Sequence, residues 1–130
     1  MSSLERILYV EDDPDIQTVA TLALEVVGGL KVKVCSSGEQ ALKEAEAFSP
    51  DMLLLDVMMP SMDGPTTLAA LRNLPSLKTV PAVFMTAKVQ PHEVDQLIAL
   101  GAESVIAKPF DPMTLANQVR RIWEQACGKQ

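Results

Sequence analysis

The chain has 130 residues, of which 48% are hydrophobic and 22% charged, and its formal net charge is -6. These values are typical of a globular protein with one hydrophobic core, and they predict a single domain over residues 1–130. The negative charge provides no basic surface for nucleic acid or acidic lipid, so binding of either by this chain alone is not expected.

Strands and helices are predicted to alternate from the start of the chain. Residues 6–11 (RILYVE) form a β-rich run, and apolar residues over 16–27 then recur at helical spacing until two glycines end the helix. Residues 31–36 alternate as a second strand. Ser36 and Glu39 have the spacing of a capping box, which predicts that a second helix begins there.

The same alternation continues through the second half of the chain. Residues 52–56 (MLLLD) are almost wholly apolar, which predicts a strand buried on both faces, and Pro65 begins a helix toward Leu71. A fourth strand is predicted over 80–87 (VPAVFMTA) and a further helix over 91–101. Residues 103–108 (ESVIAK) are the fifth predicted strand.

A last helix over 111–126, with Asp111 as its N-cap, completes five strands and five helices. This order favours an α/β fold with a parallel sheet and helices on both faces. In such folds the ligand site lies beyond the carboxyl ends of the strands. The residues that end each predicted strand are therefore the candidates for a functional site.

Polar residues gather at those carboxyl ends. They are Glu11, Asp12 and Asp13 after the first strand, Asp56 at the end of the third, Thr86 at the end of the fourth, and Lys108 after the fifth. Asp13 precedes a proline and a helix, so an N-cap role is favoured over metal ligation. Because these residues are predicted to meet at one edge of one sheet, their joint placement indicates a functional site.

This set of residues resembles the receiver domain of two-component response regulators. The resemblance covers the whole chain and is carried by YVEDD (9–13), LLLDVMMPSMDG (53–64), FMTA (84–87) and KPF (108–110). It implies a flavodoxin-like three-layer (βα)5 sandwich with strand order 2-1-3-4-5. It also implies that Asp56 accepts a phosphoryl group from a histidine kinase or a histidine phosphotransfer protein, and that Mg²⁺ is required.

The residue types suit that chemistry. A carboxylate has a reference pKa of about 3.9, so Asp56 needs no general base, but it must attack an anion. Mg²⁺ takes carboxylate and phosphate oxygens together, with Asp12 and Asp56 expected as direct ligands and Glu11 acting through water. The resemblance adds the backbone carbonyl of Met58 as a further ligand.

Lys108 and Thr86 are expected to contact the phosphoryl oxygens. In the implied strand order, the fifth strand lies two strands from the third, about 10 Å away, and a lysine stem covers most of that distance. Thr86 is one strand away, so a short hydroxyl is sufficient. The resemblance also implies a cis peptide bond between Lys108 and Pro109.

One position departs from the family pattern. Receivers commonly carry Tyr or Phe on the fifth strand, three residues before the lysine, where this chain has Val105. Phosphorylation is expected to survive this change, and we hypothesise that activation acts through the loop around Lys88 and Val89. Lys88 and Met58 are also expected to flank the path of a water attacking the acyl phosphate, although a plain surface role is equally compatible with the sequence.

Other features give simpler expectations. The first ten residues lack the apolar stretch of a signal peptide and no window has transmembrane length, which predicts a cytoplasmic protein. Cys35 and Cys127 form no CxxC or zinc pattern, so reduced thiols are expected. His92 stands alone and is interpreted as a solvated side chain.

Several functional alternatives remain. A flavodoxin-like FMN carrier needs a phosphate-binding loop where this chain has EDDPD, and a haloacid-dehalogenase-type phosphatase needs a second acid where it has Met58. A scaffold that is never phosphorylated is a third alternative. We expect a non-enzymatic regulator, either free-standing or cut from a hybrid kinase or longer regulator. It is expected to be a monomer or weak dimer that binds its downstream partner through the fourth helix, fifth strand and last helix.

Overall fold

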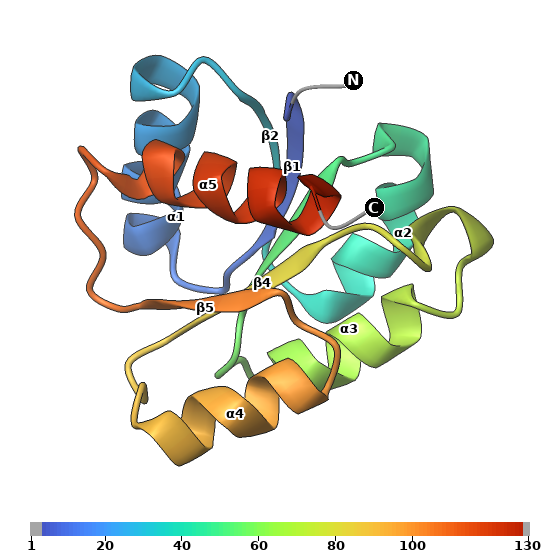
Figure 1. Ribbon diagram of the computed structural model, residues 1–130. Helices are drawn as coiled ribbons and strands as arrows, with labels where there is room; N and C mark the ends of the chain where they lie inside the picture. The colour runs from blue at the N-terminus through green and yellow to red at the C-terminus, as the bar shows by residue number, and fades with distance from the viewer. Residues whose placement is uncertain (1–3, 129–130) are drawn as a thin grey trace.

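The buried strands predicted from the sequence form one parallel sheet (Figure 1). The computed structural model describes residues 4–128. The sheet has five strands in the order β2-β1-β3-β4-β5, which confirms the flavodoxin-like arrangement. The strands are β1 (Arg6–Val10), β2 (Lys31–Cys35), β3 (Met52–Asp56), β4 (Ala82–Thr86) and β5 (Ser104–Ala107). Each lies within its predicted segment. β1 and β2 end one residue earlier than predicted, while β4 and β5 are shorter at both ends.

Helices cover both faces of the sheet, as the alternation predicted (Figure 1). They are α1 (Pro14–Leu22), α2 (Gly38–Phe48), α3 (Gly64–Leu71), α4 (Pro91–Ala99) and α5 (Leu115–Gly128). The predicted first helix continues from α1 into η1 (Ala23–Val27), which has π geometry that the sequence did not indicate. The short 3-10 helix η2 (Pro75–Leu77) was not anticipated. Among the helices of residues 4–128, none combines the length and the hydropathy that crossing a bilayer requires.

The two faces of the sheet have separate hydrophobic cores. On one face, Tyr9, Leu54 and Met85 pack against α1, η1 and α5. On the other face, Leu8, Leu55 and alternate β4 residues pack against α2, α3 and α4. Because adjacent side chains of a strand point to opposite faces, the continuous apolar runs of β3 and β4 serve both cores. The result is the expected three-layer sandwich.

The caps of two helices differ from the prediction. Ser37, not Ser36, is the N-cap of α2, since its hydroxyl accepts from the backbone N–H of Gln40 at 3.1 Å. The predicted box was therefore one residue out of register. At the other end of the chain, α5 begins at Leu115 rather than at Asp111. The Asp111 carboxylate accepts from the Met113 N–H at 2.9 Å, so it caps a turn that precedes the helix.

The end of the first helix lies where the glycine pair predicted it. Gly28 caps η1 and is followed by Gly29 at a φ of 70°. A Cβ at Gly28 would lie 2.6 Å from the Ala116 side chain, so glycine lets the end of η1 pack closely on α5. The buried face of this segment is formed by Ala20, Ala23 and Leu24, while the neighbouring valines are exposed.

Candidate functional site

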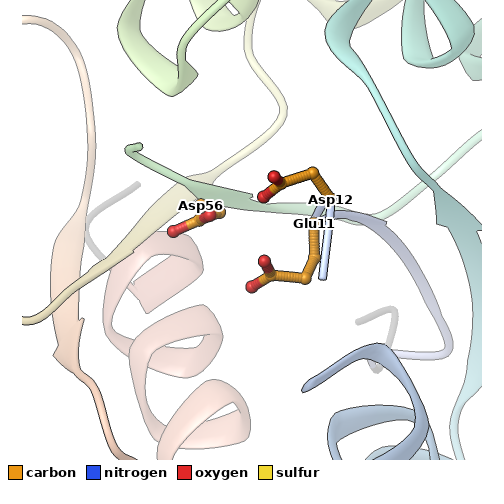
Figure 2. A group of neighbouring side chains, drawn as sticks. All are labelled: Glu11, Asp12 and Asp56. Atoms are coloured by element: carbon orange, nitrogen blue, oxygen red, sulfur yellow. The ribbon is translucent and has the colours of Figure 1, made fainter. Parts of the chain in front are cut away.

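Three acidic side chains meet at the carboxyl edge of the sheet (Figure 2). Glu11 and Asp12 directly follow β1, and Asp56 is the last residue of the neighbouring β3. One carboxylate oxygen from each lies within 4.8 Å of the others. Glu11 and Asp56 are only 1% and 3% exposed, whereas Asp12 is exposed. Adjacent parallel strands bring these residues together because their carboxyl ends share one edge.

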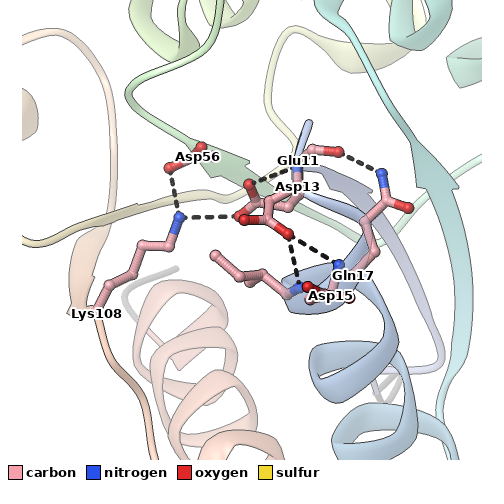
Figure 3. Close-up of polar contacts among 7 residues, drawn as sticks. Glu11, Asp13, Asp15, Gln17, Asp56 and Lys108 are labelled. Atoms are coloured by element: carbon pink, nitrogen blue, oxygen red, sulfur yellow. Dashed lines mark hydrogen bonds and ion pairs between the residues drawn. The ribbon is translucent and has the colours of Figure 1, made fainter.

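Lys108 reaches the acidic cluster from across the sheet (Figure 3). Its Nζ atom lies 3.0 Å from Asp56 Oδ1 and 2.9 Å from Glu11 Oε1. The lysine follows β5, two strands from β3, so its extended stem spans the distance that the sequence predicted. The contact with Glu11 was not anticipated, because strand order alone does not determine which of several nearby carboxylates the ammonium group of a lysine will contact. The Lys108–Pro109 peptide bond is cis, as the resemblance implied.

Burial and ion pairing have opposite effects on the pKa values of Glu11 and Lys108. Burial raises the pKa of Glu11, and its hydrogen bond to Lys108 only partly offsets this effect. For Lys108, burial lowers the pKa, but the hydrogen bonds to Glu11 and Asp56 outweigh it and hold the pKa above its usual value. The lysine therefore stays charged, and the two buried carboxylates share it.

The loop after β1 is held by its own acids. Asp13 is the N-cap of α1, since its Oδ1 accepts from the backbone N–H groups of Asp15 and Ile16 at 2.9 and 3.3 Å. Its backbone N–H donates to Glu11 Oε2 at 3.2 Å. The N-cap role predicted for Asp13 is thus confirmed, and the second Glu11 oxygen is held by a hydrogen bond as well.

Thr86 ends β4 beside the cluster and is only 4% exposed. Its hydroxyl oxygen accepts from the backbone N–H of Lys88 at 3.0 Å, which ties the hydroxyl to the first residues of the β4–α4 loop. Its carbonyl accepts from the Lys108 backbone N–H at 2.9 Å. Thr86 thus contacts both the following loop and the residue that carries the site's ammonium group.

The β3–α3 loop leaves the sheet at Asp56 and returns to it at Gly64. The Gly64 N–H donates to the Val57 carbonyl at 2.9 Å. A Cβ at Gly64 would lie 2.4 Å from the Asp56 carbonyl oxygen, so only glycine allows α3 to begin this close to β3. Between these two residues, the Met58 side chain is 66% exposed and contributes little packing.

Tyr9 lies beneath the cluster on the same face of β1 as Glu11. Its hydroxyl is buried and has no hydrogen-bond partner within residues 4–128. Burial first, and then the negative charge of Glu11, raise the pKa of Tyr9 above its ordinary value, so the phenol stays neutral. Nothing in the sequence pattern indicated a role for this residue.

Gln17 is a second residue at the site for which the sequence pattern indicated no role. It lies on α1, and its side-chain amide donates to the Glu11 backbone carbonyl (Figure 3). Side chains of a helix lean toward its N-terminus, and Gln17 lies one turn after the Asp13 cap. That position relative to the acidic loop was the signal that could have identified it.

The donor set of the cluster fits a hard divalent cation. All three groups are carboxylates, the ligands preferred by Mg²⁺ and Ca²⁺, and no histidine or cysteine belongs to the group. Three carboxylates and one ammonium leave two negative charges uncompensated. A divalent ion would balance them. The arrangement thus presents an ionised carboxylate, a cation site and a lysine donor at one point.

Comparisons with known proteins identify the class to which this fold and site belong. The family described as "Response regulator receiver domain" matches residues 7–120. The chain is 36% identical over 116 residues to the DNA-binding response regulator MtrA of Mycolicibacterium smegmatis, covering 89% of this chain and 49% of that protein. It is 34% identical over 115 residues to an uncharacterized 14.6 kDa protein of Leptolyngbya boryana, covering 88% and 87%.

Solved structures agree with the sequence relatives. The chemotaxis protein CheY4 of Vibrio cholerae superposes with a TM-score of 0.85 at 28% identity, covering 92% of this chain and 99% of that one. The chain therefore belongs to the receiver domain family of two-component response regulators. Receiver domains are signalling proteins rather than conventional enzymes. The chain spans about half the length of MtrA, whose name refers to DNA binding by the whole protein.

Proposed function

We propose that this chain is a phosphoacceptor domain in which Asp56 takes a phosphoryl group from the phosphohistidine of a histidine kinase or phosphotransfer protein. The observation that supports this most is the placement of Lys108 Nζ at 3.0 Å from Asp56 within a cluster of three carboxylates. A structural acid at the end of a buried strand needs neither a lysine from two strands away nor two further acids beside it.

The proposed reaction is a direct displacement at phosphorus. A carboxylate oxygen of Asp56 forms the new P–O bond, the P–N bond to the donor histidine breaks, and the electron pair stays on the imidazole. Asp56 is the nucleophile. Lys108 and Thr86 are proposed to donate to the oxygens of the transferred group, because one brings an ammonium and the other a hydroxyl to the same edge.

Mg²⁺ is the proposed cofactor, and when bound it would offset the negative charge shared by the phosphoryl group and the carboxylates. Asp12 and Asp56 are proposed as direct ligands with the Met58 carbonyl, and Glu11 through water. Both Glu11 oxygens already accept hydrogen bonds, from Lys108 and from the Asp13 N–H. Within residues 4–128, the Asp12 carboxylate and Asp56 Oδ2 accept none, which favours these two as direct ligands.

The partner is proposed to approach beside Lys108. A groove of about 470 Å³ lies there, lined mainly by apolar side chains, among them Ile16, Val19, Pro109 and Phe110. Lys108 lines the groove and also pairs with Asp56. A helix carrying a phosphohistidine is therefore proposed to pack in the groove, with its imidazole directed toward Asp56. After phosphorylation, the downstream protein is proposed to bind the face formed by α4, β5 and α5. Transfer from a sensor kinase implies a cytoplasmic location.

The proposal is tested by incubating the protein with acetyl phosphate and Mg²⁺ and measuring the intact mass. One base-labile phosphate is expected on the wild type. None is expected on Asp56→Ala or in the presence of EDTA, since the nucleophile or the cation is then missing. Asp95→Ala, which changes an exposed aspartate on α4, is the matched control and should be phosphorylated like the wild type. A phosphate that persists on Asp56→Ala would contradict the assignment.

A further inference from the structure

The Gln17 side chain joins two loops at the border of the acidic cluster. Its Nε2 donates to the Glu11 backbone carbonyl at 2.5 Å (Figure 3) and to the Ser36 hydroxyl oxygen at 3.2 Å. Glu11 follows β1, and Ser36 follows the neighbouring β2. A side-chain amide has two N–H donors, so one nitrogen serves both acceptors. Gln17 therefore connects α1 to the starts of two loops at the carboxyl edge of the sheet.

The hydrogen bond from Gln17 fixes the peptide unit that leads into Asp12. The carbonyl of Glu11 and the nitrogen of Asp12 belong to the same planar group, so holding the oxygen also sets the direction in which the Asp12 backbone leaves. The Glu11 N–H is held in addition, because it donates to the Cys35 carbonyl at 3.0 Å. The backbone immediately before Asp12 is thus held on both sides.

Asp12 depends on this support more than the other two acids do. The carboxylates of Glu11 and Asp56 are buried, and each is paired with Lys108. The Asp12 side chain is exposed, and within residues 4–128 its carboxylate accepts no hydrogen bond. Its carboxylate nevertheless lies in one group with those of Glu11 and Asp56, and the hydrogen bonds described above hold the peptide that leads into it.

We propose that Gln17 is a positioning residue for the acidic cluster: its amide holds the Glu11–Asp12 peptide so that the Asp12 carboxylate faces Asp56. The inference rests on the proposed function, in that the bound ion is taken to be Mg²⁺. The Gln17 side chain donates to a backbone carbonyl and to a hydroxyl, and within residues 4–128 to none of the three carboxylates. Its effect is therefore expected in the affinity for the ion and in the order of the loop.

The first test is a calorimetric titration of Mg²⁺ into metal-free protein without any phosphodonor. Gln17→Met keeps the length of the side chain and a similar helix propensity but removes the N–H donors. Its Mg²⁺ affinity is expected to fall about 10-fold, the scale of effect seen when residues that orient metal ligands are replaced. The matched control is Gln118→Met on α5, where the lost contact is to Thr114 and the affinity should not change.

The second test needs no metal. Hydrogen exchange of the Asp12 and Asp13 backbone amides is expected to be faster in Gln17→Met than in the wild type. Gln17→Arg, which again places N–H donors on this side chain, should return it toward the wild-type rate. Mg²⁺ affinity and exchange in Gln17→Met that match the wild type would overturn the inference while leaving the proposed function intact. So would an equal loss in Gln118→Met. A wild type that takes up no Mg²⁺ would overturn both.

Discussion

Cys35 shows how burial alone decides the chemistry of a side chain in this fold. It ends β2 and is fully buried, and burial raises the pKa of its thiol to about 11. Cys127 near the end of α5 is partly exposed. Because only the thiolate is nucleophilic, Cys35 should be inert at neutral pH even though the two residues are chemically identical.

Alkylation with iodoacetamide at pH 8 followed by intact mass is therefore expected to add a single group, on Cys127. A pKa near 11 reduces the thiolate population of Cys35 about 100-fold relative to an ordinary cysteine, and burial restricts access further. In urea, two groups should be added, since both thiols are then exposed. Equal labelling of both cysteines in the folded protein would contradict the prediction.

The same shift has a consequence for stability against pH. The folded-state pKa of Cys35 lies above its unfolded value of about 9. The buried neutral thiol therefore contributes fully to the free energy of unfolding below pH 9, and this contribution is lost as the pH rises toward 11. Cys35→Ala should therefore lose less stability than the wild type between pH 9 and pH 10.5. Urea unfolding at several pH values, followed by the fluorescence of Trp123, measures the difference.

At the scale of elements, Arg72 forms hydrogen bonds to three segments that no strand pairing connects to α3. Arg72 follows α3, and its Nη1 donates to the carbonyls of Leu77 and Val80 at 2.8 and 2.5 Å. Its Nη2 lies 3.4 Å from the Gly101 carbonyl, after α4. The end of α3 is thus joined to η2, to the approach to β4 and to the turn before β5.

Arg72→Met should lower the free energy of unfolding by about 2 kcal/mol, because it leaves partly buried carbonyls without their charged donor. Arg72→Lys should recover only part of that loss, since an ammonium cannot reproduce the planar fork of donors. The exposed Arg121 provides the control, and Arg121→Met should change stability by less than about 0.5 kcal/mol. Urea unfolding that shows equal losses in Arg72→Met and Arg121→Met would refute the assigned role.

The existence and order of the elements followed from the sequence, but several ends did not. Continuous apolar runs identified β3 and β4, because a strand buried on both faces is apolar at successive positions and does not alternate with polar residues. The N-cap of α2 was misplaced by one residue because Ser36 and Ser37 are both good caps. Only the register of the backbone decides which hydroxyl meets the Gln40 N–H. The start of α5 was misplaced because Asp111 caps a turn as readily as a helix.

At the scale of the whole molecule, the composition of the site was predictable, but its internal contacts were not. Parallel strands carry their final residues to one edge, so the meeting of Glu11, Asp12 and Asp56 follows from topology. Lys108 forms ion pairs with both Glu11 and Asp56. This pairing depends on side-chain rotamers and burial, which cannot be predicted from the spacing of residues in the sequence. The contact of Gln17 with the Glu11 carbonyl is of the same kind, because it joins a helix to a loop through the backbone.

The route by which the site communicates with the rest of the molecule gives the last prediction. Val105 stands where the resemblance to receivers led us to expect Tyr or Phe, and it is partly buried against the core under α4. The site is connected to the β4–α4 loop by the hydrogen bond from the Lys88 N–H to the Thr86 hydroxyl, at 3.0 Å. Movement of Thr86 toward a phosphoryl group would therefore displace the β4–α4 loop directly.

We accordingly expect beryllofluoride with Mg²⁺ to change the backbone amide NMR shifts of residues 86–90 more than those of α1. The signals of Lys88 and Val89 should move most, because the Lys88 N–H is bonded to the hydroxyl that moves. Asp56→Asn treated identically is the control and should show no such change. Thr86→Ala should bind beryllofluoride but leave the loop unmoved, since the hydroxyl is absent. If the amide shifts of residues 86–90 do not change in the wild type while those of α1 do, the conformational change is transmitted by another route. The hydrogen bond between Thr86 and Lys88 then serves only to order the loop.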